Sequence, residues 1–230
     1  TTDTWGATLH TLPAVATDVI RFRMGGVVYL AFAHTGGYSY TSDGIAWVDR
    51  TTDTLYLVFW DEALWGMDNT GQLWKSTAIG VEVNNSQLQL PDGSVTKLFV
   101  ARNSADTLVI FAATTEGPYA HDNANSKFLF TELTFPTHPD NGKGSTRWRD
   151  ATYIPVGLSV TYYVQGSNQA VVAVMGPDRD DGLPSDQRGV IRQLLGTQND
   201  LLALLDATSA GAAQTLFATT GLGSHRSGVL

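Results

Sequence analysis

The chain has no cysteine among its 230 residues. Disulfide bridges, thiolate metal ligands and cysteine nucleophiles are therefore excluded. No apolar run approaches the roughly 18 residues that a membrane-spanning helix needs, and no charged-then-apolar leader is recognisable. Basic residues are also scarce, because 14 Lys and Arg stand against 22 Asp and Glu, a formal net charge of −8. Nucleic-acid surfaces need clustered basic side chains to neutralise phosphates, so the composition argues against such a surface.

The one dense basic stretch is Arg147-Trp-Arg149, with Lys143 just upstream. Asp140 and Asp150 flank this stretch, so its net field is small. We therefore expect no nucleic-acid partner. The chain starts at Thr1, and residues 214–220 have the pattern of a strand that opens a further unit. Both features favour a portion of a longer chain.

The chain does contain a loose internal repeat, in which an apolar β-type run leads through a Gly/Asp-rich turn to a strand with an aromatic residue. Three copies are clear: Tyr29-Leu-Ala-Phe-Ala33 leading to Trp47, Leu55-Tyr-Leu-Val-Phe59 leading to Trp74, and Thr107-Leu-Val-Ile-Phe-Ala112 leading to Phe128. Weaker copies begin at Ala170 and Leu201. Their spacing varies between about 30 and 60 residues, which is typical of propellers and solenoids.

Turn signals recur about every ten residues between short β-type runs, and helical patterns are nearly absent. We therefore predict an all-β fold, a β-propeller or a several-blade portion of one, with four-stranded antiparallel blades. The expected arrangement is one domain over residues 1–230, and the recurring Trp residues are expected to wedge between blades. The blade-like units cover about 1–50, 51–94, 95–150, 151–189 and 190–230.

Residues 190–205 are ambiguous. Their leucines fit a helical stripe, but Gly196 and Asn199-Asp200 lie in the middle, where turn residues would join two strands. We favour two short strands. The alternative is a β-sandwich with a helical tail over this segment.

Two stretches are typical of long loops. Residues 136–146 contain two prolines and two glycines, and residues 176–189 are also rich in Gly, Pro and Asp. Loops of this length are often functional. We expect both to make contacts with partners.

The segment Thr41-Ser-Asp-Gly-Ile-Ala-Trp47 resembles the Asp-box, or BNR repeat, of sialidases and other propellers. Asp43, Gly44 and Trp47 match its pattern, although the Asp-to-Gly spacing is one residue short. Asp68, Gly71 and Trp74 keep the Gly-to-Trp interval, and the stretch from Asp122 to Phe128 is more degenerate. The resemblance implies a folding element, with the carboxylate accepting turn amides and the Trp packed between blades. It implies a fold, and such propellers include glycosidases, lectins, sorting receptors and phage structural parts.

A sialidase-like site would need three arginines, a Tyr–Glu nucleophile pair and an Asp acid. Arg21, Arg23, Arg50 and Arg102 are available, but none has the Arg-Ile-Pro setting of that family, and Arg21-Phe-Arg23 is more simply a strand with two solvated charges. Aromatics such as Trp60, Trp65 and Tyr119 could stack on sugars, although packing between blades explains most of them. We assign no catalytic residue.

Other motifs are weak. Asp178-Arg-Asp-Asp-Gly182 has part of a Ca²⁺-loop pattern, but an acidic solvated turn explains it as well. The five His residues lack metal-ligand spacing, and Gly142-Lys-Gly-Ser145 lacks the first glycine of a phosphate loop. Asn84-Asn-Ser86 matches a glycosylation acceptor. We therefore assign no metal and no cofactor.

The sequence thus predicts a non-catalytic structural or recognition module, extracellular or on a virion surface, within a phage or virus particle or a cell-surface assembly. The expected partners are copies of itself or neighbouring subunits, and a glycan or receptor is a further candidate. The alternative is a carbohydrate-binding or glycosidase propeller. That alternative predicts aromatics gathered with carboxylates and an Arg at one face.

Overall fold

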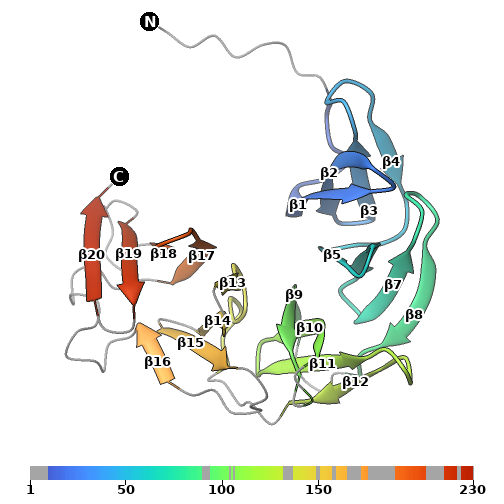
Figure 1. Cartoon of the computed structure of the whole chain (residues 1–230). Coiled ribbons are helices and arrows are strands. Elements are labelled where there is room, and N and C mark those ends of the chain that lie inside the picture. The colour runs from blue at the N-terminus through green and yellow to red at the C-terminus, as the bar shows by residue number, and fades with distance from the viewer. Residues whose placement is uncertain are drawn as a thin grey trace, which may run out of the picture. The chain divides into compact units, whose positions relative to one another are not determined.

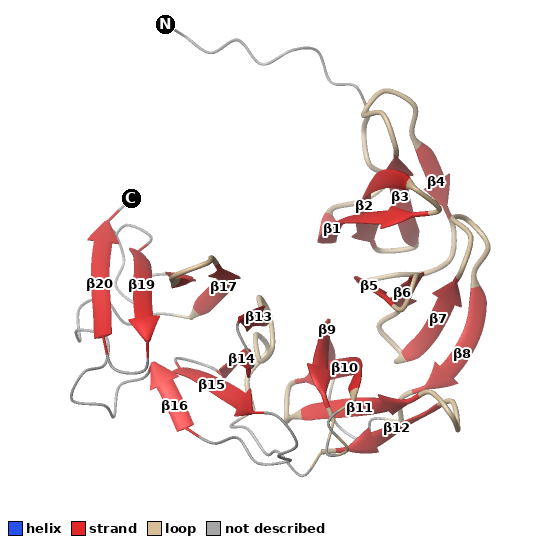
Figure 2. Ribbon diagram, in the orientation of Figure 1, coloured by secondary structure: helices blue, strands red, loops and turns tan. Residues whose placement is uncertain are grey.

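The structure is a computed structural model that describes residues 10–89, 94–103, 105, 107–131, 137–148, 151–156, 159–164, 172–175, 190–205, 215–221 and 224–229. The chain divides into two compact units, Thr1–Leu88 and Gln89–Leu230. All regular structure in the described residues is β-strand (Figures 1 and 2). The described part contains no helix long and apolar enough to cross a membrane.

The first unit contains two four-stranded antiparallel sheets whose strands pair in chain order. The first sheet consists of β1 (Ala16–Met24), β2 (Val27–His34), β3 (Gly37–Thr41) and β4 (Val48–Arg50). The second consists of β5 (Tyr56–Trp60), β6 (Ala63–Met67), β7 (Gln72–Ser76) and β8 (Val83–Gln87). In both sheets the connections are hairpins, as the density of turn residues predicts.

The second unit contains three more sheets with the same antiparallel order. They are built from β9 (Val95–Arg102), β10 (Leu108–Thr114), β11 (Pro118–Asp122) and β12 (Lys127–Phe130); β13 (Thr146–Trp148), β14 (Ala151–Val156), β15 (Ser159–Val164) and β16 (Val172–Met175); and β17 (Ile191–Gly196), β18 (Leu201–Leu205), β19 (Thr215–Gly221) and β20 (Ser224–Val229). The all-β, blade-like fold is therefore confirmed for the described residues, while closure into a propeller stays a prediction.

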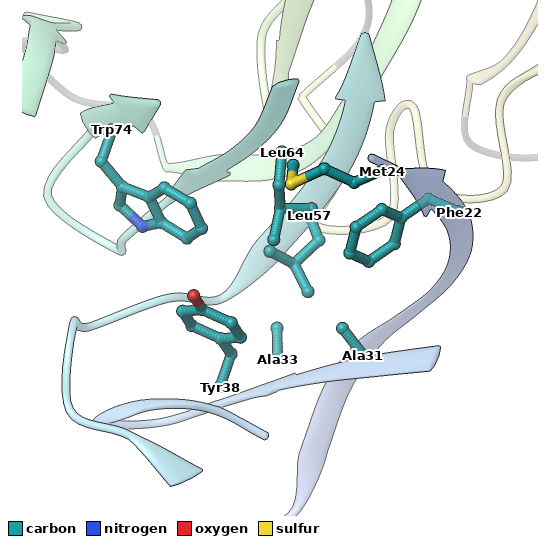
Figure 3. Packing of buried hydrophobic residues seen from close by; sticks show 8 residues of the cluster. All are labelled: Phe22, Met24, Ala31, Ala33, Tyr38, Leu57, Leu64 and Trp74. Carbon is teal, nitrogen blue, oxygen red and sulfur yellow. The ribbon is translucent and has the colours of Figure 1, made fainter. Parts of the chain in front are cut away.

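The core of the first unit lies between its two sheets (Figure 3). Strand β1 alternates, with Phe22 and Met24 buried and Arg21 and Arg23 exposed, as expected for a strand with one covered face. The remaining residues of the cluster are small on β2 and large elsewhere: Ala31, Ala33, Tyr38, Leu57, Leu64 and Trp74. Small residues beside large ones let the two faces interdigitate at the density of a protein interior.

Two buried tryptophans join neighbouring sheets, as expected. Trp74 of β7 stacks on Tyr38 of β3, with ring centroids 5.3 Å apart. Trp148 of β13 donates its indole N–H to the Thr197 carbonyl, beyond the end of β17, at 2.7 Å. Each ring lies against a glycine. A Cβ at Gly66 would lie 2.2 Å from the Trp74 side chain, and a Cβ at Gly196 would lie 2.7 Å from the Trp148 side chain. A residue without a side chain is what allows these rings to approach the backbone.

Trp47 departs from this expectation. It precedes β4 and contacts Phe32 of its own sheet and His10, whose ring is stacked on it at 4.9 Å. The match between Trp47 and Trp74 is therefore not a structural equivalence, because the Asp43 turn joins the third and fourth strands of its sheet and the Asp68 turn joins the second and third. The Asp122 turn, between β11 and β12, occupies the same place as the Asp43 turn.

Residues 190–205 form the hairpin β17–β18, with Gly196 opposite Leu201, so the two-strand prediction is confirmed and the helical alternative is wrong. One expected boundary also changes. Thr146–Trp148, placed in the 95–150 range, pairs with β14 and belongs to the fourth sheet, because Arg147 lies opposite Thr152.

Candidate functional site

Three side chains that are distant in the sequence meet between the two sheets of the first unit, and we call them the Glu82 cluster: Tyr38, Arg50 and Glu82. The Arg50 guanidinium donates to both carboxylate oxygens, from Nε at 3.2 Å and from Nη2 at 2.8 Å. The Tyr38 hydroxyl donates to Glu82 Oε1. Arg50 Nη2 also donates to the Gly80 carbonyl at 2.6 Å. The cluster thus ties β3 and β4 to the loop between β7 and β8.

Burial and hydrogen bonding set the charges of the Glu82 cluster. Burial acts to raise the pKa of Glu82, but the hydrogen bonds from Arg50 and Tyr38 outweigh it and hold that pKa below its ordinary value. Burial, and then the hydrogen bond to Glu82, raises the pKa of Tyr38 far above that of a free tyrosine. Near neutral pH the cluster is therefore a carboxylate–guanidinium pair with a neutral phenol.

A Tyr–Glu pair beside an arginine is the core of the sialidase-like site considered above, so its exposure matters. Tyr38 is fully buried, and the Glu82 side chain is 7% exposed. The phenol oxygen is already engaged by the carboxylate, and one face of the Tyr38 ring is stacked on Trp74. A nucleophile must lie within about 3.5 Å of the atom it attacks. This pair is sealed from any substrate and acts as a structural link.

The other arginines of that hypothesis lie elsewhere. Arg21 and Arg23 are exposed on β1, as the solvated-strand interpretation predicts, and Arg102 lies on β9 in the second unit. The aromatics proposed for sugar stacking also differ in exposure. Trp65 is 1% exposed, with Lys75 Nζ 4.8 Å from its ring centroid, whereas Trp60 and Tyr119 are half-buried.

A second charged group lies in the loop before β13. Asp140 accepts from Lys143 Nζ at 2.6 Å and is paired with Arg192 Nη1 at 3.1 Å. Burial acts to raise the pKa of Asp140, but the hydrogen bond from Lys143 and the charges of Lys143, Arg192 and His138 outweigh it and lower that pKa. Of the basic residues noted in the sequence, Asp140 thus pairs with Lys143, just upstream of Arg147.

The loop that contains Asp140 is held by three sheets. Gly142 donates to the Pro155 carbonyl at 2.8 Å, Gly144 accepts from Leu194 at 3.1 Å, and the Asn141 side chain donates to the Thr115 carbonyl at 2.8 Å. Asn141 is completely buried. The expectation that residues 136–146 form a loop is confirmed for 137–145, and the centre of this loop is packed inside the second unit. Its contact with partners stays a prediction.

The first unit also has an open hollow of about 540 Å³, lined by residues 23–26, Phe59, Glu62 and Thr77. It lies where the β1–β2 turn, the end of β5 and the segment after β7 come together, and we call it the β1–β5 hollow. Phe59 forms part of its wall and is stacked on Phe22 at 5.2 Å. The hollow thus combines one half-buried aromatic ring, a carboxylate and an arginine, which is part of the combination predicted for the carbohydrate-binding alternative.

The acidic turns stabilise hairpins. The Asp43 carboxylate accepts the Ile45 and Ala46 amides, both at 2.8 Å, and these bonds lower the pKa of Asp43. Asp122 accepts from the Asn125 side chain and backbone, which lowers its pKa too. A carboxylate accepting turn amides is the role that the Asp-box resemblance implies for Asp43. The assignment of these turns to that family stays a prediction.

Metal-binding residues do not gather in the described part of the chain, where no group of three or more His, Asp or Glu could hold an ion. His10 is paired with Asp49, His34 with Ser39 and His121 with Asn123. The Asp178–Gly182 segment and the whole loop 176–189 lie outside the described residues. Of the glycosylation motif, Asn84 is exposed on β8 and Ser86 is buried.

Sequence reasoning alone missed Glu82 and Glu62. Glu82 is 32 residues from Arg50 and 44 from Tyr38, so no local pattern joins them. The sequence does contain a signal for Glu62. Asp61-Glu62 has the position of a hairpin turn but lacks the usual glycine or asparagine, which marks Glu62 as unusual.

No protein-family model and no curated protein matches the chain. Solved structures do match it in fold. The extracellular domain of a hybrid two-component system from B. thetaiotaomicron has a TM-score of 0.67 at 14% identity over 97% of this chain and 29% of that one. A computationally designed protein has a TM-score of 0.56 at 12% identity over 90% of this chain and 60% of its own.

An exo-β-1,3-galactanase from Phanerochaete chrysosporium, solved with β-1,3-galactotriose, has a TM-score of 0.51 at 8% identity over 97% of this chain and 69% of its own. The chain thus spans less than two thirds of the first two of these three proteins. At these identities the likeness concerns the fold alone, and it supports the blade-like, all-β architecture.

Proposed function

We propose that the chain is a non-catalytic structural and recognition module of an extracellular or virion-surface assembly. The observation that carries this proposal is the burial of the Glu82 cluster, since Tyr38 is fully buried and hydrogen-bonded to a carboxylate that is itself paired with Arg50. The Glu82 cluster, which has the residue types of a catalytic site, therefore holds two sheets together. The extracellular placement is supported by the fold likeness to the B. thetaiotaomicron extracellular domain.

Packing against other subunits is supported by apolar side chains on the outer strands. The fourth strand is one of the two edge strands of each sheet in the first unit. Val48 of β4 and Val83 of β8 are 42% and 63% exposed, and Val81, just before β8, is 59% exposed. Exposed apolar groups on an edge strand favour association with another chain. The partners proposed are copies of this chain or neighbouring subunits of a particle.

Self-association is the measurable consequence. Native mass spectrometry or light scattering on the chain is expected to give a mass of at least twice 24.7 kDa. The double variant Val81→Glu/Val83→Glu is expected to shift the mass to that of the monomer, because two carboxylates replace the apolar contact.

Val27→Glu is the control. Val27 is also exposed, at 43%, but lies on β2, an inner strand of the first sheet. The control is expected to keep the wild-type mass. A monomeric wild-type chain would contradict the packing proposal.

Carbohydrate binding is the second candidate function. The β1–β5 hollow favours it, because an aromatic ring, a carboxylate and an arginine share one depression on an accessible surface. This candidate is also non-catalytic, and the galactanase contributes only its fold likeness to it.

A further inference from the structure

The charges of the β1–β5 hollow differ from those of the Glu82 cluster in having no partner among the described residues. Within the part of the chain that the structure describes, neither the Arg23 guanidinium nor the Glu62 carboxylate forms a hydrogen bond or an ion pair, and both residues are exposed. Arg50 and Glu82, by contrast, satisfy each other. Small-molecule sites orient a ligand with a few hydrogen-bond donors and acceptors that line an otherwise apolar pocket. Arg23 and Glu62 are available for this role.

The backbone of the hollow carries strain at its acidic rim. The β5–β6 turn places Asp61 and Glu62 at φ +50° and +56°. The corresponding turn of the first sheet, between β1 and β2, uses Gly25 and Gly26 for the same left-handed conformation. Glycine adopts these angles without the Cβ penalty that a glutamate meets. Glu62 thus occupies a backbone conformation that glycine would adopt at a lower cost. Residues strained in this way cluster at functional sites, which favours a functional role for the Glu62 side chain.

The wall of the hollow indicates the class of ligand. Phe59 and Met24 supply apolar surface, and the electron-rich face of an aromatic ring attracts the weakly positive C–H groups of a sugar face. Arg23 offers several donors and Glu62 two acceptor oxygens, which suits adjacent hydroxyl groups. The two charges cancel, so neither an acidic nor a basic sugar is favoured. The volume of about 540 Å³ lies in the usual range for small ligands.

We propose that the β1–β5 hollow binds a neutral saccharide, with one sugar ring against Phe59 and its hydroxyl groups hydrogen-bonded to Arg23 and Glu62. This inference rests on the proposed recognition function and assigns it a site. The residues act by binding alone, and no bond of the saccharide is broken.

The test is a calorimetric or NMR titration of the wild-type chain with neutral trisaccharides of galactose, glucose and mannose. Sialyllactose, a galacturonate trimer and a zwitterionic dipeptide serve as comparison ligands. Three variants probe the site: Phe59→Leu removes the aromatic ring but keeps an apolar side chain, Arg23→Gln removes the guanidinium, and Glu62→Gly removes the carboxylate while fitting the positive φ. Arg21→Gln is the matched control, because Arg21 is also exposed on β1 but lies outside this hollow.

The expected result is saturable binding of at least one neutral trisaccharide, weakened at least tenfold in each of the three variants and unchanged in Arg21→Gln. Melting temperatures of Arg23→Gln and Glu62→Gly are expected to stay at or above that of the wild type, so lost binding is not lost folding. Wild-type binding that all three variants retain would overturn the site. Preference for the dipeptide or an acidic sugar, or no saccharide binding, would overturn the ligand class.

The same samples separate this inference from the function on which it rests. If the trisaccharide is cleaved during the titration, the non-catalytic proposal fails. If it is neither cleaved nor bound, the saccharide inference alone fails, and the packing proposal is untouched.

Discussion

Replacing Glu82 by alanine is expected to lower the free energy of unfolding by about 3 kcal/mol, as typically found when one partner of a buried charge pair is removed. The substitution leaves the fully buried Tyr38 hydroxyl without its acceptor, and the Arg50 guanidinium with the Gly80 carbonyl but without a carboxylate. Because Arg50 is 35% exposed, water recovers part of its solvation and keeps the loss at the lower end of the range. Urea unfolding at neutral pH measures the difference.

Glu116→Ala is the matched control, because Glu116 is an exposed glutamate whose carboxylate has no partner among the described residues. It is expected to change stability by less than about 0.5 kcal/mol. A Glu82→Ala variant as stable as this control would contradict the structural role of the Glu82 cluster.

The stability that Glu82 contributes also depends on pH. Its folded-state pKa lies below its ordinary value, so its contribution is fully present above the unfolded pKa of about 4.3. That contribution is lost as pH falls through the folded pKa. The stability difference between wild type and Glu82→Ala is therefore expected to shrink on acidification from neutral pH to about pH 3.

Gly142→Ala is expected to have an effect of similar size in the second unit, again about 3 kcal/mol. A Cβ at this position would lie 2.2 Å from the Cβ of Ala113, and the residue has φ +77°. Overpacking costs about 1–3 kcal/mol, and left-handed backbone adds about 1–2 kcal/mol for a residue with a side chain. Urea unfolding again provides the measurement.

Gly36→Ala isolates the backbone part of this effect, because Gly36 has φ +86° and no atom within 4 Å of its Cβ position. Its expected cost is only about 1–2 kcal/mol. Combining Gly142→Ala with Ala113→Gly is expected to recover part of the loss, since the colliding atom is removed. Equal costs at Gly142 and Gly36 would mean that the loop is not packed as described.

The strands were predictable because their signals are local. Alternation in β1, the apolar run of β2 and the turn residues around Gly44 are each readable within ten residues. Even the ambiguous segment 190–205 was resolved correctly by Gly196 and Asn199-Asp200, which mark a hairpin between two short strands.

Other features depend on contacts between segments, which no local sequence pattern indicates. The equal Gly-to-Trp intervals at Trp47 and Trp74 suggested equivalent positions, but the two turns belong to different hairpins of their sheets. Likewise, Gly142 and Gly144 indicated only a long loop, whereas a Cβ at either position would collide with Ala113 or Gln193. Composition alone cannot distinguish a glycine that makes the backbone flexible from a glycine that is needed because a neighbouring residue leaves no room for a side chain.

The sequence predicted the residue types of the candidate sites but not which residues form them. An arginine, an aromatic and a carboxylate were expected together for carbohydrate binding, but Arg23, Phe59 and Glu62 meet only through the packing of β1 beside β5. The sequence equally offered Arg50 and several tyrosines for catalysis, and only burial excludes that role for Tyr38.

The most direct test of the account is the turnover of fluorogenic glycosides, sialosides included, by the wild-type chain and its Glu82→Gln variant. The account predicts no release of fluorophore above the buffer rate from either protein, because the Tyr38–Glu82 pair cannot reach a substrate. Wild-type turnover that Glu82→Gln abolishes without unfolding the chain would contradict it, since Glu82 would then be catalytic and the module an enzyme.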